Sequence, residues 1–82
     1  MDQIQRKEDG SLVIFDNVFY PVSPGGMEEE FEYRFSPEQV KALEAQLSKD
    51  HPGKSLEEAL NEYNGDTLRE YLMKNKLEFF LI

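Results

Sequence analysis

Carboxylates are the side chains with the greatest capacity for chemistry in this sequence. The chain has 17 Asp and Glu residues, one histidine, His51, and no cysteine. A carboxyl group that acts as a general acid needs an apolar pocket to raise its pKa, and no pattern in the sequence marks such a pocket. His51 has no second histidine and no cysteine with which to form a nucleophile–base pair or a transition-metal site. We therefore expect no catalytic residues and no enzyme.

The sequence also lacks a pattern for binding phosphate or calcium. Gly25-Gly26 precedes a predicted strand rather than a helix, and the glutamates at 28–30 would repel an anion. Asp16-Asn17 offers oxygen ligands, but the ligand spacing of an EF-hand is missing. Alternate carboxylates along a strand lie about 6.6–6.8 Å apart, which is wider than the shell of one cation prefers. We expect neither a cofactor nor a metal.

The negative charge is concentrated in one part of the chain. No basic residue lies between Lys7 and Arg34, and the acidic residues there contribute seven of the net eight negative charges. We predict that the following residues bind a partner: Asp16, Glu28, Glu29, Glu30 and Glu32. The partner would be a basic protein, because complementary charge guides association, whereas the phosphates of a nucleic acid would be repelled. The alternative is that the charge serves only solubility and the protection of strand edges.

Two turn signals lie near the start of the chain. Asp9-Gly10 favours a two-residue turn between strands at 4–8 and 11–15. Asp16-Asn17 is a weaker signal of the same kind and predicts a second turn before a strand at 18–22. The result is a three-stranded meander.

A further strand is predicted at residues 27–35. Phe31, Tyr33 and Phe35 alternate there with charged residues, which indicates one buried face and one face in water. Glu28, Glu30 and Glu32 fall on the second face and form a row whose nearest basic neighbour in sequence is Arg34.

A turn at Asp16-Asn17 would make the meander apolar on both faces. One face would carry Val13, Phe15, Val18 and Tyr20, and the other would carry Leu12, Ile14 and Phe19. Short helices cover only one face of a sheet, so we predict that Leu12, Ile14 and Phe19 bind a second copy of the chain as a homodimer. The alternative is that sheet curvature or a closing strand covers this face.

Helices are predicted after Ser36. Ser36 and Gln39 fit a capping box with Pro37 at the first helical position, and the helix ends at His51-Pro52-Gly53. Its buried stripe comprises Val40, Leu43 and Leu47.

Two shorter helices and a strand follow. Ser55 and Glu58 form a second capping box, and Asn64-Gly65 is predicted to end that helix. Asp66 is predicted to cap a third helix. The apolar stripes of the two helices comprise Leu56, Ala59, Leu60 and Tyr63, then Leu68, Tyr71 and Leu72. Residues 77–82 carry apolar side chains at both odd and even positions, which predicts a closing strand buried on both faces of the sheet.

These elements predict a single α+β domain over residues 1–82. It would be an antiparallel sheet, built from the N-terminal meander and a C-terminal strand, with two to three short helices packed on one face. No apolar run is long enough to cross a membrane and no signal peptide is recognisable, so we expect a cytoplasmic protein without membrane contact.

The function predicted from this composition is that of a small acidic protein-interaction module. Its partner would be a basic protein that binds or cleaves nucleic acid, and the module would act as an inhibitor or immunity-type antagonist of that protein. The alternative is a structural or regulatory subunit that homodimerises through an exposed sheet face or edge.

Overall fold

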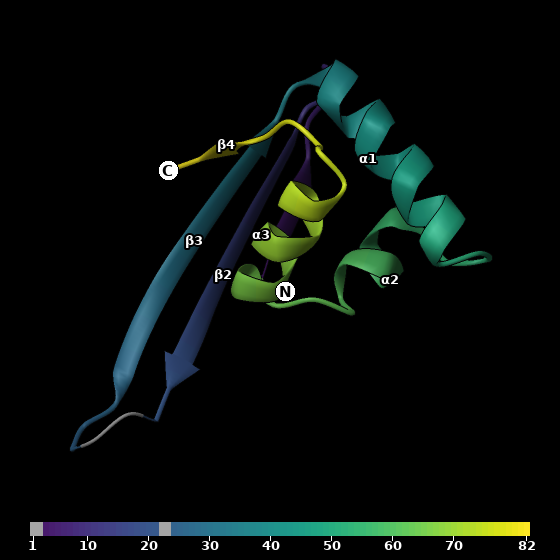
Figure 1. The fold of residues 1–82 in the computed structure, drawn as a ribbon. Helices are drawn as coiled ribbons and strands as arrows, with labels where there is room; N and C mark the ends of the chain where they lie inside the picture. The colour runs from purple at the N-terminus through teal and green to yellow at the C-terminus, as the bar shows by residue number, and fades with distance from the viewer. Residues whose placement is uncertain (1–2, 22–23) are drawn as a thin grey trace.

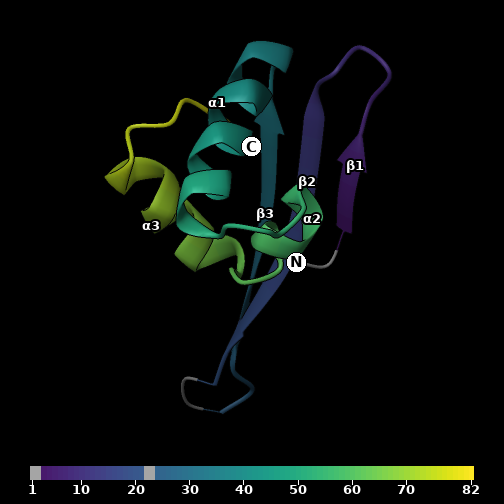
Figure 2. The same cartoon turned by 90° about the vertical axis from the view of Figure 1, so that its right-hand side faces the viewer.

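The computed structural model describes residues 3–21 and 24–82 and shows an α+β fold. The elements are β1 (Gln3–Arg6), β2 (Leu12–Tyr20), β3 (Met27–Phe35), α1 (Pro37–Asp50), α2 (Leu56–Leu60), α3 (Gly65–Lys74) and β4 (Phe80–Leu81). The strands form one antiparallel sheet in the order β1-β2-β3-β4. The three helices lie together on one face of it (Figures 1 and 2). The predicted fold class is confirmed.

The first hairpin turn is longer than predicted. The loop includes Lys7, whose N–H donates to the carbonyl of Ser11 at 2.9 Å, so it is not a two-residue turn. The carboxylate of Asp9 accepts from both the N–H and the hydroxyl of Ser11, and Gly10 has a φ of +93°. These side-chain bonds and the left-handed glycine stabilise the wider loop.

The predicted turn at Asp16-Asn17 is wrong. Strand β2 runs without interruption from Leu12 to Tyr20 and pairs with β3 along that whole length. Asp16 is 6% exposed, and its carboxylate accepts a hydrogen bond of 2.5 Å from the N–H of Gly65, the first residue of α3. Pairing with β3 and this long-range bond outweigh the local turn preference. The end of the strand predicted at 18–22 lies outside the described residues.

A continuous β2 also changes which residues share a face. Leu12 and Ile14 are fully buried beneath the helices, whereas Phe19 lies on the opposite face and is 61% exposed. The predicted homodimer surface of Leu12, Ile14 and Phe19 therefore does not exist as one surface.

The core lies between the sheet and the helices. Strand residues Phe31, Tyr33 and Phe35 are buried there as predicted. The other members of the core cluster are Leu12, Ile14, Val40, Leu43, Leu47, Leu56, Ala59, Leu60, Leu68 and Leu72. Burial of each large apolar side chain contributes about 1.5–3 kcal/mol, so this single cluster is the main source of stability.

Helices α1 and α2 begin as predicted, and α3 does not. Ser36 and Ser55 are N-caps in complete capping boxes. The N-cap of α3 is Asn64, whose side chain accepts from Thr67 N–H at 2.8 Å, rather than Asp66. Because α2 ends at Leu60, Asn64-Gly65 starts a helix instead of ending one.

The C-terminal strand exists, but it is shorter and more exposed than predicted. β4 is Phe80–Leu81, and it pairs with Arg34 and Tyr33 at the edge of the sheet. Both of its side chains are exposed, whereas Leu77 and Phe79 before it are partly buried against the core, with the ring of Phe79 beside that of Tyr33. A continuous apolar run is typical of a buried strand, but here no further strand covers it in the described part of the chain.

No helix among the described residues is long and apolar enough to span a membrane.

Candidate functional site

The candidate site is the sheet face that points away from the helices, which we call the open face. Along it, β2 and β3 place an apolar column beside an acidic one. Phe15 pairs with Glu32, and Phe19 pairs with Glu28. Between these pairs, Glu30 lies opposite Asn17. Side chains of paired residues project from the same side of a sheet, so this face combines apolar surface with a row of carboxylates.

The acidic row consists of Glu28, Glu30 and Glu32, as the alternation of β3 predicted. Glu28 and Glu30 are exposed, and no ion pair to either is found among the described residues. Glu32 differs, because its Oε2 accepts from Nε of Arg34 at 2.7 Å. The row therefore has one neutralised end and two carboxylates that face water.

The other two predicted partner residues lie elsewhere. Glu29 pairs with Val18 and projects from the opposite side of the sheet, although it is exposed. Asp16 is buried against the start of α3, where it accepts from Gly65. Reading Leu12, Ile14, Asp16 and Val18 as one alternating strand would have indicated that Asp16 points toward the core.

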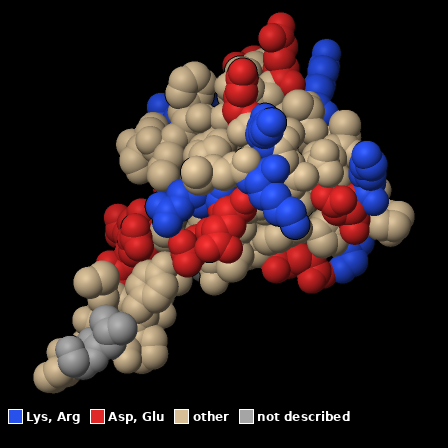
Figure 3. Space-filling model, viewed as in Figure 1, with Lys and Arg blue, Asp and Glu red and all other residues tan. Residues whose placement is uncertain are grey.

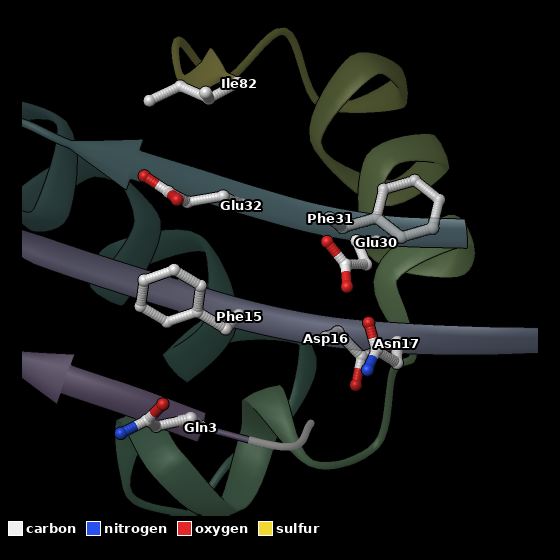
Figure 4. A pocket seen from close by; sticks show the side chains of 8 residues that line it. All are labelled: Gln3, Phe15, Asp16, Asn17, Glu30, Phe31, Glu32 and Ile82. Atoms are coloured by element: carbon white, nitrogen blue, oxygen red, sulfur yellow. The ribbon is translucent and has the colours of Figure 1, made fainter. Parts of the chain in front are cut away.

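A shallow hollow of about 720 Å³ lies on the open face beside the row. Gln3 of β1, Phe15 of β2 and Glu32 of β3 lie next to one another across it, and Ile82 borders it (Figure 4). The hollow offers a ring face and carboxylates, but no histidine and no basic side chain among its described lining residues. Its aromatic ring and carboxylates together offer apolar contact and negative charge.

Beyond the hollow, β2 and β3 continue as a two-stranded arm, residues 17–20 and 27–30. Among the described residues, β1 pairs with β2 only as far as Phe15, and no strand flanks the arm beyond that point. The arm extends past the helices (Figures 1 and 2), and the molecule is 42 Å long but only 25 and 21 Å across. Phe19 and Met27 on it are 61% and 56% exposed. Figure 3 shows acidic atoms where the arm leaves the body, and no charged atoms on the described part of its tip in this view.

Away from the open face, a polar cluster joins the helices. Its members are Asp50, His51, Tyr63 and Tyr71. Nε2 of His51 lies 2.8 Å from the hydroxyl of Tyr63, and the hydroxyl of Tyr71 donates to Asp50 at 2.7 Å. Burial, then the bond to Asp50, raises the pKa of Tyr71 above its ordinary value. A tyrosine held neutral in this way stays a donor, so the cluster ties the end of α1 to α3.

Residues 3–21 and 24–82 contain no group of three or more His, Cys, Asp or Glu side chains that could hold a metal ion. Comparison with known proteins adds no candidate: no family model matches the chain, and neither a curated protein nor a solved structure resembles it significantly. What the protein does must therefore be inferred from the open face itself.

Proposed function

We propose that this protein is a small interaction module whose open face binds a basic protein. The observation that carries the proposal is the row of Glu28, Glu30 and Glu32 projecting from that face beside Phe15 and Phe19. Apolar contact supplies much of the affinity of a protein interface, while complementary charge raises the association rate and excludes wrong partners. The open face offers both on neighbouring strands.

The partner we propose is a protein that binds or cleaves nucleic acid, with this chain as its inhibitor or immunity-type antagonist. A protein of that class has a basic surface shaped to receive negative charge. A row of carboxylates would compete for that surface, and the net charge of −8 would speed the encounter. Binding of this kind weakens as ionic strength rises.

Charge reversal on the row tests the proposal. Glu28→Lys with Glu30→Lys changes the two carboxylates of the row that form no ion pair with any described residue. The control is Glu38→Lys with Glu70→Lys, which changes net charge equally on the exposed surface of the helices. Circular dichroism should show all three proteins folded, because exposed charges contribute little to stability.

Each protein would be immobilised and used to capture partners from a lysate of the source organism at low and high salt. We expect the parent and the control to capture one or more basic proteins at low salt. The row variant should fail to capture them. A captured protein should then bind nucleic acid less well when the parent is added. Capture of the same proteins at the same level by the row variant would contradict the proposal, because the row would then be only a solvated surface.

A further inference from the structure

The outer edge of β3 is an open hydrogen-bonding edge. Of the strands in residues 3–21 and 24–82, β4 alone lies beside that edge, and it pairs with Tyr33 and Arg34. The last bond of this ladder runs from the N–H of Ile82 to the carbonyl of Glu32 at 3.0 Å. In the described part of the chain, no strand lies beside residues 27–31 on this side.

The alternation of the strand shows which backbone groups the open edge presents. Residues of an antiparallel strand point their N–H and C=O alternately to the two neighbours. Because the carbonyl of Glu32 points to β4, the N–H and C=O groups of Glu30 and Glu28 also point outward. The same two residues carry the free carboxylates of the acidic row.

From this coincidence we propose that the edge at Glu28 and Glu30 binds an extended basic segment of the partner as an added strand. The inference rests on the proposed function and specifies how the partner is held. In an antiparallel ladder, residues that exchange hydrogen bonds lie about 5.5 Å apart and project on the same face. An added strand would therefore place alternate side chains beside the two carboxylates, and Lys or Arg at positions i and i+2 would complement them.

Charge decides between this occupant and a second copy of the chain. Two copies joined through the same edge would bring Glu28 and Glu30 against the glutamates of the other copy, and like charges directly opposite each other destabilise a sheet. A nucleic acid would be repelled and has no strand backbone to pair. A basic extended segment satisfies both the edge and the row.

The test uses synthetic eight-residue peptides of alternating lysine and threonine. One control peptide has the same composition with its lysines in one block. A second keeps the alternating sequence but carries N-methyl groups on the backbone amides that would pair with the edge. Affinity is measured by titration, and exchange of the Glu28 and Glu30 amide protons is followed by NMR.

We expect the alternating peptide to bind and to slow exchange of the Glu28 and Glu30 amides, with the N-methylated peptide about tenfold weaker and giving no protection. A matched pair of protein variants gives an independent readout. Glu30→Pro and Glu30→Ala both lose the charge, but only the proline removes the outward N–H, which edge strands tolerate. The proline variant should bind the alternating peptide more weakly than the alanine variant.

The outcomes separate this inference from the proposed function. If all three peptides bind equally, with salt dependence but without amide protection, the edge does not add a strand, while the basic-partner proposal stands. If the edge amides are protected but Glu28→Lys with Glu30→Lys binds equally well, the charge does not select the occupant and the inference is also overturned. If no basic peptide binds at low salt, both proposals lose their support.

Discussion

Replacing Asp16 with alanine should destabilise the fold strongly, although Asp16 belongs to the segment that carries the acidic charge. The carboxylate is 6% exposed and accepts a hydrogen bond from the N–H of Gly65 at 2.5 Å. Gly65 is the first residue of α3, where backbone N–H groups have no partner within the helix and a negative charge is favourable. The bond therefore holds α3 on the sheet.

The size of the effect follows from two contributions. A hydrogen bond to a charged group contributes about 1.5–3 kcal/mol, and a buried N–H left without a partner costs about 1–3 kcal/mol. These contributions overlap, so Asp16→Ala should lower the free energy of unfolding by about 2–4 kcal/mol. Asp16→Asn keeps an acceptor and loses the charge, so it should lose about half as much.

Urea unfolding followed by circular dichroism measures both variants. The control is Glu30→Ala, which removes an exposed carboxylate from the neighbouring strand and should leave the unfolding midpoint close to that of the parent. If Asp16→Ala unfolds at the same urea concentration as the parent, Asp16 does not anchor α3. Pairing with β3 alone would then have to outweigh the turn preference of Asp16-Asn17.

Three further predictions, at the start of α3, at two helix caps and at Tyr33, test the rest of the fold by the same measurement. Gly65→Ala would place a Cβ 2.7 Å from Cγ of Phe31, so it should lower the free energy of unfolding by about 1–3 kcal/mol. Adding Phe31→Leu to the same chain should recover part of this loss. An unchanged unfolding midpoint for Gly65→Ala would contradict the close approach. Ser36→Ala and Ser55→Ala should each cost about 1 kcal/mol, because each removes the acceptor of a capping box. Burial raises the pKa of Tyr33 to about 12, so the unfolded chain ionises near the ordinary value of 10.0 while the fold keeps the phenol neutral. Stability should therefore fall as pH rises from about 10 towards 12, and Tyr33→Phe should reduce that fall; an unchanged slope would show that Tyr33 ionises freely.

The parts of the fold that were predicted from sequence depend on short-range patterns. A capping box lies within four residues, and both boxes starting at Ser36 and Ser55 formed. The alternation of Phe31, Tyr33 and Phe35 likewise identified the buried face of β3. In each case, neighbours in sequence determine the structure.

The parts that were missed depend on long-range contacts or on competing local signals. Asp16-Asn17 is a turn signal by itself, but the partner of Asp16 lies 49 residues later in the chain. At the start of α3, Asn64 and Asp66 were both able to cap, and the reciprocal bond with Thr67 favours Asn64. The apolar run at 77–82 predicts a buried strand, but burial requires a further neighbour that local composition does not specify.

The structure separates the predicted partner residues by what each does inside the molecule. Asp16 engages α3, Glu32 engages Arg34, and no ion pair involves Glu28 or Glu30 in the part of the chain that is described. A residue that stabilises the fold and one that binds a partner should therefore give opposite results in two assays. Asp16→Ala should lower stability, whereas Glu28→Ala with Glu30→Ala should leave the unfolding midpoint close to that of the parent and weaken binding of the alternating lysine peptide. If the double variant is destabilised as much as Asp16→Ala, the carboxylates of Glu28 and Glu30 stabilise the fold. They are then not available to bind a partner.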